Sequence, residues 1–288
     1  MPAISRIGDF SLVWGESVRW DDQRGRLYFV DCGSQRLHWL NGAEPPLHSL
    51  QMPSMPAGLA LASDGRLVAA LDDGLHVVDT DTADIRLLAT YPDALGGRAN
   101  DAAADLDGNL ITGTLNLQEA PGSYWWYSAA LGWRQLDDGI SNANGPVVLD
   151  SDDGQTLVIA DTAASALYAY DYDGVAGRAT NRRLVVDTTT LGGMPDGASA
   201  DADGGVWSCI LGAGIMARWG GDGITEVIDA GVELPSDVTF GGDHLDRMFF
   251  VSIAVAIGEV AITSPYAGAL MVVDGVGRRG RLEPRVRL

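Results

Sequence analysis

The sequence predicts an all-β fold, a six-bladed β-propeller with about four antiparallel strands in each blade, as a single domain over residues 1–288. Three observations support this prediction. A unit made of a short apolar strand, a polar turn and a second apolar strand occurs six times along the chain. The turns recur every 40 to 50 residues, a period typical of propeller blades. The sequence also lacks the apolar periodicity of an amphipathic helix of ordinary length.

The six units are hairpins, and each begins a blade. In chain order they are GESVRWDDQRGRLYFVD (15–31), AGLALASDGRLVAAL (57–71), NDAAADLDGNLITGTL (100–115), NGPVVLDSDDGQTLVIAD (144–161), PDGASADADGGVWSCI (195–210) and PSDVTFGGDHLDRMFFVS (235–252). The glycines at positions 25, 65, 108, 154 and 204 mark turns spaced by 40, 43, 46 and 50 residues, and the sixth turn follows 42 residues later. Further strand-like stretches after each hairpin, such as 75–79 and 86–89, bring each blade to about four strands.

The composition restricts the classes of partner and cofactor. The chain has 19 basic and 39 acidic residues, and its net charge of −20 argues against nucleic acid or an anionic membrane as a partner. All 19 basic residues are arginine, which excludes Schiff-base enzymes and the phosphate-binding lysine of P-loops. The four histidines and two cysteines show no metal-binding spacing, so a structural zinc site is not expected.

The sequence gives an expectation for the location of the protein. Its first residues contain no apolar run of signal-peptide length, and no segment approaches the length of a membrane span. We therefore expect a cytoplasmic protein, monomeric or weakly self-associating. Its two thiols, Cys32 and Cys209, are expected to be reduced, although a disulfide between them is left open.

The innermost strand of each propeller blade lines a central channel, so the first residues of the six hairpins converge there. Two of these positions are Pro56-Ala57 and Ser236-Asp237. The other four carry oxygen-bearing side chains at a matching register: Glu16, Asn100, Asn144 and Asp196. Two carboxylates in a narrow channel repel each other and lose hydration, and a cation relieves both effects. Carboxylate and amide oxygens without His or Cys suit a hard ion, Ca²⁺ or Mg²⁺, with Mn²⁺ as an alternative.

The hairpins also carry a resemblance that runs through nearly the whole chain. The stretches that carry it are GESVRWDDQRGRLYFVD, RANDAAADLDGNLITGTL, ISNANGPVVLDSDDGQTLVIADT, PDGASADADGGVWSCI, FGGDHLDRMFFVS and SPYAGALMVVDGVGRRG. In this order they resemble the motifs of the SMP-30/gluconolactonase family, also called the regucalcin family. The resemblance implies a six-bladed propeller with one divalent metal ion in its channel. It also implies hydrolysis of sugar lactones or related cyclic esters.

The resemblance assigns roles to individual residues. It implies Glu16, Asn144 and Asp196 as metal ligands, with Ca²⁺ placed first and Mn²⁺, Mg²⁺ or Zn²⁺ as alternatives. Asp196 is also implied as the general base. Its place between proline and glycine leaves a plain turn-forming role as the alternative.

The resemblance also implies a set of substrate-binding residues. These are Arg98, Asn100 and either Gln118 or the adjacent Glu119. The chain departs from the family pattern at Ser17-Val18, where Gly-Pro is usual, and at Ala99, where Pro or Phe is usual. These departures spare the ligand set and concern the sugar specificity.

The expected reaction is metal-dependent lactone hydrolysis, in which the ion polarises the carbonyl and Asp196 activates water. No G-x-S-x-G motif points to a serine hydrolase. Two other functions remain open at this stage. One is a non-catalytic propeller that binds a divalent metal through the same ligands. The other is a phosphotriesterase-like hydrolase on the same site.

Four other features have structural interpretations. The aromatic stretch SYWWYSAALGW (123–133) is expected to pack in an outer strand, and the histidines are expected to be structural. Arg98 could instead form a salt bridge, and Asp101 is as suited to a structural role as to a catalytic one. The C-terminal stretch has five arginines in its last eleven residues, and we expect a solvated end that folds back on the acidic body.

Overall fold

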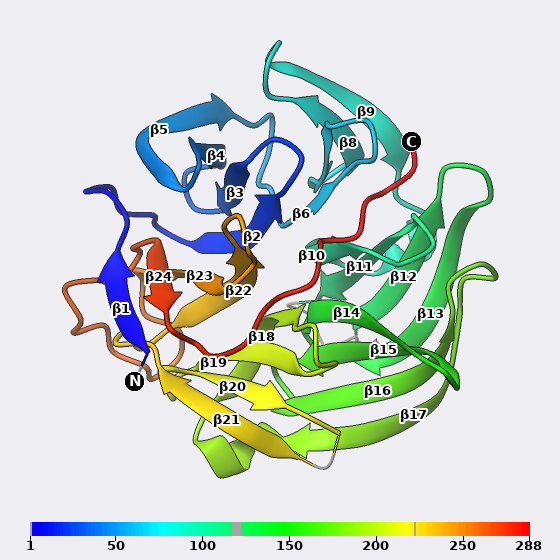
Figure 1. Ribbon diagram of the computed structural model, residues 1–288. Helices are drawn as coiled ribbons and strands as arrows, with labels where there is room; N and C mark the ends of the chain where they lie inside the picture. Colours follow the sequence, from blue (N-terminus) through cyan, green and yellow to red (C-terminus); the bar gives the residue numbers. More distant parts are fainter. Residues whose placement is uncertain (1, 117–121, 222) are drawn as a thin grey trace.

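The computed structural model describes residues 2–116, 122–221 and 223–288. These residues form six four-stranded antiparallel sheets arranged around a central channel, so the predicted six-bladed β-propeller is confirmed (Figure 1). Helical structure in the described ranges is confined to two short 3₁₀ turns, η1 (Asp93–Leu95) and η2 (Thr188–Leu191). None of the helices in these ranges is long and apolar enough to span a bilayer.

Each sheet forms one blade, and its strands run outward from the channel in sequence order in the first five blades. Blade 1 contains β2 (Gly15–Asp21), β3 (Arg26–Asp31), β4 (Arg36–Asn41) and β5 (Glu44–Gln51); blade 2 contains β6 (Gly58–Leu61), β7 (Leu67–Ala70), β8 (Gly74–Asp79) and β9 (Asp84–Thr90). Blade 3 contains β10 (Arg98–Ala104), β11 (Leu110–Leu115), β12 (Gly122–Ser128) and β13 (Gly132–Ile140). Blade 4 contains β14 (Ala143–Ser151), β15 (Gly154–Asp161), β16 (Ala166–Asp173) and β17 (Arg178–Asp187). Blade 5 contains β18 (Met194–Ala200), β19 (Val206–Leu211), β20 (Ile215–Trp219) and β21 (Ile224–Asp229).

Blade 6 joins the two ends of the chain. It contains β22 (Pro235–Gly241), β23 (Arg247–Ser252), β24 (Met271–Asp274) and, outermost, the N-terminal strand β1 (Ala3–Arg6). β1 pairs antiparallel with β24 along its whole length. The hairpin pattern did not predict β1, because the four residues of this strand precede the first hairpin. This pairing closes the ring.

Apolar layers between neighbouring blades form the core. The aromatic stretch at 123–133 belongs to one such layer, because every residue of β12 is buried. Tyr124 and Trp126 of β12 pack with side chains of blade 4 such as Leu157 and Ile159. The structural interpretation of this stretch is therefore confirmed.

The innermost strands are distorted near the ends from which they start. β-Bulges interrupt the inner ladder next to Glu16, Asn100, Asn144 and Pro195, and again at Pro235, whereas β6 of blade 2 pairs without one. A bulge redirects the side chains beside it, and bulges are common next to functional sites. Glu16, Asn100 and Asn144 are each followed by a residue in the left-handed region. These residues are Ser17, Asp101 and Gly145, with φ angles of 49°, 48° and 56°. The same local distortion therefore aims several inner-strand side chains into one end of the channel.

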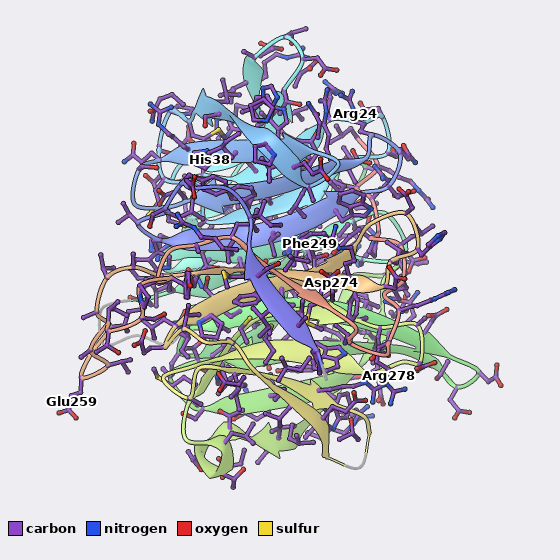
Figure 2. The ribbon with its side chains drawn as sticks, turned by 60° about the vertical axis from the view of Figure 1, so that its left-hand side comes forward. Arg24, His38, Phe249, Glu259, Asp274 and Arg278 are labelled. Carbon is purple, nitrogen blue, oxygen red and sulfur yellow. The ribbon has the colours of Figure 1, made fainter. Side chains whose placement is uncertain are left out.

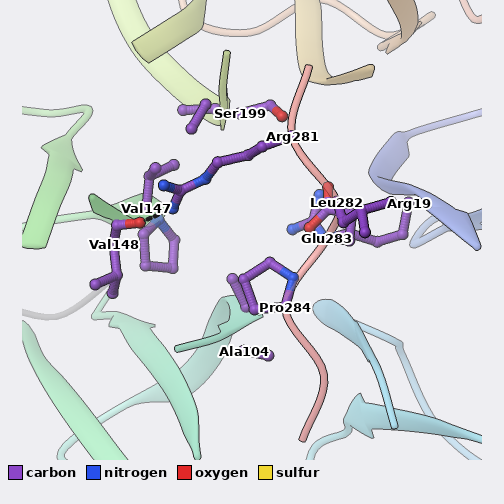
Figure 3. Close-up of a pocket in the computed structure, with 13 residues that line it drawn as sticks. Arg19, Ala104, Val147, Val148, Ser199, Arg281, Leu282, Glu283 and Pro284 are labelled. Atoms are coloured by element: carbon purple, nitrogen blue, oxygen red, sulfur yellow. Dashed lines mark hydrogen bonds between the residues drawn. The ribbon is translucent and has the colours of Figure 1, made fainter. Parts of the chain in front are cut away.

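The other end of the channel is crossed by residues 278–288, which we call the C-terminal strap (Figure 1). Val286 of the strap forms a parallel bridge with Ala62 of blade 2, and Gly280 donates its N–H to the Leu245 carbonyl of blade 6. Arg281 donates to the Val148 carbonyl, as Figure 3 shows.

The strap also forms salt bridges with acidic residues on several blades. Its arginines pair with Asp21, Asp22, Asp150, Asp203 and Glu226 at 2.6 to 3.3 Å. The predicted return of the C-terminus onto acidic residues is confirmed, but the expectation of a solvated end holds only in part, because Arg279, Leu282, Arg287 and Leu288 are exposed whereas Gly280 and Val286 are buried. Val286 is only 1% exposed, because the strap backbone pairs with the blades and its apolar side chain is enclosed.

Candidate active site

A cavity of about 290 Å³ opens at the end of the channel where the inner strands start. Its lining brings together five of the residues that the sequence singled out: Glu16, Arg98, Asn100, Asn144 and Asp196. The other two, Gln118 and Glu119, lie outside the described residues. Figure 2 shows Glu259 and Arg278 on opposite sides of the molecule. Glu259 belongs to the loop whose Ile257 lines this cavity, and Arg278 begins the strap, so the two ends of the channel are distinct.

Three oxygen-bearing side chains come from the inner strands of blades 1, 4 and 5. Glu16 accepts a hydrogen bond from the Trp14 indole at 3.1 Å through one carboxylate oxygen. Asn144 donates its amide N–H to Thr162 Oγ1 at 2.7 Å, and Thr162 in turn donates to the Pro195 carbonyl at 2.7 Å. This chain of bonds fixes the Asn144 amide and links it to the backbone just before Asp196.

The two carboxylates of this group are electrostatically strained. Burial raises the pKa of Asp196 well above its usual range, and the charges of Asp101 and Asp237 raise it further. The pKa of Glu16 is also raised, mainly by burial and then by the charges of Asp196, Asp237 and Asp101. Charged carboxylates at these positions therefore need a cation to offset the cost of burial and repulsion.

Arg19, a buried cation on the strand that carries Glu16, is already paired with other acids. Arg19 forms salt bridges with Asp237 at 2.7 Å and with Asp101 at 3.4 Å, and it is 3% exposed. Across residues 2–116, 122–221 and 223–288, neither Glu16 nor Asp196 forms a salt bridge with any arginine. Their negative charge is thus left for a cation that the described chain does not supply.

The acids held by Arg19 brace the backbone beside the cavity. Asp237 accepts the Val18 N–H at 2.8 Å, and Asp101 accepts the Gly145 N–H at 2.8 Å. Gly197 lies so close to Asp237 that a Cβ built there would come within 2.2 Å of its carboxylate. Gly145 and Gly197 directly follow the ligand candidates Asn144 and Asp196, and Val18 lies two positions after Glu16. Of the two roles that the sequence left open for Asp101, structural or catalytic, these contacts support the structural one.

A second polar group lines the cavity from blades 3 and 4. Asn100 donates its amide N–H to Asn144 Oδ1 at 2.8 Å and to the Ala143 carbonyl at 2.9 Å, and Asn142 lies beside it at 3.3 Å. Arg98 donates to the Ala99 carbonyl at 3.2 Å, and within the described part of the chain it takes part in no ion pair. Among the described residues, the alternative interpretation of Arg98 as a salt-bridge residue finds no acidic partner.

The remaining sulfur and imidazole groups do not complete a metal site. Cys32 and Cys209 are free and buried, so the open question of a disulfide is settled, and Cys32 lines the cavity with its thiol bonded to the Pro56 carbonyl. The four histidines, all in described ranges, are not among the lining residues. Over those ranges no three His, Cys, Asp or Glu side chains gather as a metal-binding group. A metal bound in this cavity would therefore have two carboxylates and an amide oxygen as its side-chain ligands.

Sequence reasoning missed the residues that brace the site and those that form its apolar side. Arg19 follows the Glu16 motif by three positions, but nothing in the sequence pairs it with Asp101 and Asp237. The apolar lining residues, among them Met194, Leu211 and Ile257, carry no motif at all.

The chain is similar to known proteins over its whole length. Residues 14–254 match the family model described as SMP-30/Gluconolactonase/LRE-like region. The pentonolactonase XacC of Haloferax volcanii is 30% identical over 293 residues, which cover 98% of this chain and 97% of that protein. A calcium-binding protein, regucalcin, from Agrobacterium tumefaciens str. C58 is 28% identical, with a TM-score of 0.87 over 98% of this chain and 97% of its own. A luciferin-regenerating enzyme, 22% identical, shares the fold with a TM-score of 0.91 and full coverage of both chains.

Proposed function

The chain belongs to the SMP-30/gluconolactonase/LRE-like family, and we propose that it is a metal-dependent lactonase that hydrolyses a sugar lactone or a related cyclic ester. The observation that carries this proposal is a pair of carboxylates, the buried Asp196 and the half-buried Glu16, that face one cavity with no arginine paired to them in the described chain. The similarity to a pentonolactonase over nearly the full length of both chains supports the reaction class.

The donor set fits a hard divalent cation. Glu16 and Asp196 offer carboxylate oxygens, and Asn144 offers an amide oxygen whose orientation is set by its bond to Thr162. Such oxygen ligands favour Ca²⁺ or Mg²⁺, and the similarity to a calcium-binding regucalcin supports Ca²⁺ as the first candidate. When bound there, the cation supplies Lewis-acid polarisation of the lactone carbonyl and stabilises the developing oxyanion.

The chain's own residues supply proton transfer and orientation. Asp196 takes a proton from the attacking water, whose oxygen forms the new bond to the carbonyl carbon. The bond between the acyl carbon and the ring oxygen then breaks, and Asp196 returns its proton to the ring oxygen, so the product is an open-chain hydroxy acid and the base is restored. Arg98 and Asn100 lie on one side of the cavity, where they hold the substrate by hydrogen bonds.

The two alternative functions make different demands on the residues beside the metal ligands, Arg98 and Asn100. A purely structural ion needs only its ligands, whereas here an arginine without an ion pair in the described chain lines the same cavity. A phosphotriesterase would use the same ligands on a different electrophile. Assays of metal-loaded protein with lactones and with a phosphotriester separate the three functions, because a purely structural ion leaves both substrates unhydrolysed.

The test is hydrolysis of a lactone panel by the purified protein in a pH-stat, with its metal content measured. Exhaustive chelation is expected to abolish hydrolysis, and Ca²⁺, Mn²⁺, Mg²⁺ or Zn²⁺ is expected to restore it to different degrees. Metal-loaded protein that hydrolyses a phosphotriester but no lactone would favour the phosphotriesterase. Full turnover in protein shown to be free of metal would refute the role of the ion.

A further inference from the structure

The cavity has two chemically different sides. Five apolar side chains, which we call the apolar wall, line it and also pack together in one cluster: Trp14, Met194, Leu211, Ile253 and Ile257. They come from the segment before β2, from β18 and β19, and from the segment after β23. The wall therefore spans blades 5, 6 and 1. The polar residues Arg98, Asn100 and Asn142 come from blades 3 and 4, on the other side of the ring, where Leu115 and Ala163 also line the cavity but do not belong to this cluster.

Few polar side chains in the cavity remain able to form hydrogen bonds with a substrate, because most already have partners within the protein. Glu16, Asn144 and Asp196 form the proposed metal site. Thr162 is bonded to Asn144 and to the Pro195 carbonyl. Among the described lining residues this leaves Arg98 and Asn142 with donors for a substrate, whereas Asn100 contributes only its Oδ1, because its amide group already donates to Asn142, Ala143 and Asn144. All three lie on the polar side, so a substrate meets its hydrogen-bond partners on one flank only.

Burial of a hydroxyl against an apolar surface without a partner is costly. A lactone with hydroxyls all around its ring would place some of them against Met194, Leu211 and the isoleucines. Burial of a methylene group at the same place is favourable, by roughly 0.8 kcal/mol for each CH₂ in transfer data. The two sides of the cavity therefore favour a substrate that is polar at the reacting carbonyl and apolar at the opposite end.

We propose that the apolar wall is a substrate subsite, and that it seats an alkyl substituent on the ring of the lactone. This inference rests on the proposed function, because it places the ester group of the ring beside Asp196 and Arg98. The substituent points from the ring toward Met194 and Ile257. The subsite is continuous with the proposed metal site, since one cavity of about 290 Å³ contains both. That volume suits a small molecule, not a polymer.

The first experiment is a chain-length series. We would measure kcat/KM of the metal-loaded protein for γ-butyrolactone, γ-hexalactone, γ-octalactone and γ-decalactone, alongside glucono-1,5-lactone and xylono-1,4-lactone. Each methylene that reaches the wall is expected to raise kcat/KM by about fourfold, which is the transfer value per buried CH₂ expressed as a rate ratio. The best alkyl lactone is expected to exceed both sugar lactones.

The second experiment uses variants of the wall and a matched control. Met194→Gln keeps the length of the side chain, and Ile257→Asn changes a half-buried residue. Each is expected to lower the ratio of kcat/KM for γ-decalactone to that for γ-butyrolactone at least tenfold. The control is Val227→Asn on β21, the outermost strand of the blade that carries Met194, where the side chain is 51% exposed. This ratio is expected to stay at the wild-type value in the control.

The outcomes separate this inference from the proposed function. Efficient hydrolysis of the sugar lactones with no dependence on alkyl chain length would overturn the subsite and leave the lactonase in place. An unchanged ratio in both wall variants, with a normal metal content and thermal transition, would also overturn it. Hydrolysis of no lactone by metal-loaded protein would refute both proposals.

Discussion

Two aspartates at opposite ends of β18 have opposite environments. Asp196, near the start of the strand, lines the cavity, and its pKa is raised by burial and by neighbouring acids. Asp201 follows the other end of the strand, where burial would raise its pKa, but hydrogen bonds from Arg218 and the Gly205 N–H lower it overall. Arg218 Nε lies 2.5 Å from Asp201. The fold thus neutralises one buried aspartate and leaves the other without an arginine partner in the described chain.

The two ends of the channel repeat this difference on a larger scale. At the strap end, arginines of the strap meet acids of several blades, and the cavity beneath them measures about 30 Å³ (Figure 3). At the other end the cavity is about 290 Å³, and its carboxylates have no such partners among the described residues. A buried charge that the protein leaves unpaired is a candidate for function, whereas a paired one is a structural element.

The largest expected effect comes from removing the charge of Asp196. Asp196→Asn keeps the side-chain size and one ligand oxygen but removes the general base. Measured at saturating metal, kcat is expected to fall by about two to four powers of ten, the range for loss of general-base catalysis. The thermal transition should change little, because no core volume is lost.

The same variant tests the plain ligand or turn role of Asp196. Asparagine is good in turns and can bind a cation through its carbonyl, so such a role predicts substantial remaining activity. A metal-replete Asp196→Asn protein with nearly wild-type kcat would therefore leave Asp196 as a ligand only. Metal occupancy has to be measured in the assay itself, since the substitution also weakens the site.

Much of the cavity's polar residue set was predictable, because it depends on the register of short hairpins. Glu16, Asn100, Asn144 and Asp196 each stand where a hairpin starts, and a ring of blades brings such positions together. The apolar wall was not predictable in this way. Its members come from segments outside the hairpin starts, and apolar residues in such segments look like ordinary core in the sequence.

The bracing contacts were also beyond the sequence. Asp237 occupies the matching position in blade 6, yet it bonds the Val18 N–H and Arg19 of blade 1. That contact joins the inner strand of the last blade to the inner strand of the first, which are neighbours because the ring of blades closes. Local patterns do not record contacts between the ends of a chain, so the closing strand and the Arg19 salt bridges had to be observed.

At the other end of β18, Asp201→Asn should affect stability instead of catalysis. Arg218 is 5% exposed, and removing its carboxylate partner leaves a buried charge poorly compensated. We expect a loss of about 3 kcal/mol in the free energy of unfolding at pH 7, measured by urea denaturation. The kcat of the remaining folded protein is expected to stay at the wild-type value.

The pH dependence of this loss gives an independent check. Because the folded-state pKa of Asp201 is lowered, its contribution is present above the unfolded-state pKa near 4 and is lost as the pH falls through the folded value. The stability difference between the wild-type protein and the variant should therefore shrink at pH 3. A difference that is the same at pH 3 and pH 7 would contradict the ion-pair explanation.

A smaller effect is expected at the polar side of the cavity. Arg98→Ala removes a guanidinium that makes no ion pair in the described chain, so folding and metal content should persist. The lost hydrogen bond to the substrate should lower kcat/KM by about 5- to 150-fold, equivalent to roughly 1–3 kcal/mol. The measurement is steady-state kinetics with the metal content confirmed near one equivalent. Unchanged kinetics would remove Arg98 from the substrate-binding residues.

The smallest effect concerns two equivalent backbone positions, Ser17 in blade 1 and Asp101 in blade 3. Both follow the inner-strand residue beside a bulge, and both hold left-handed φ angles, 49° and 48°. Left-handed backbone is costly for residues other than glycine. The side chains differ, because Asp101 bonds Arg19 and two backbone N–H groups, whereas the buried hydroxyl of Ser17 has no hydrogen-bond partner in the described chain.

Glycine should therefore have opposite effects at these two positions. Ser17→Gly relieves the backbone strain and removes an unsatisfied hydroxyl, which outweighs the added flexibility of the unfolded chain. We expect a gain of about 1 kcal/mol, or roughly 2 °C in Tm for a domain of this size, with kcat unchanged. Asp101→Gly relieves the same strain but removes the bonds to Arg19 and Gly145, so it should lower Tm. A lower Tm for Ser17→Gly would show that its hydroxyl or its backbone restriction stabilises blade 1, and that the two positions are not equivalent.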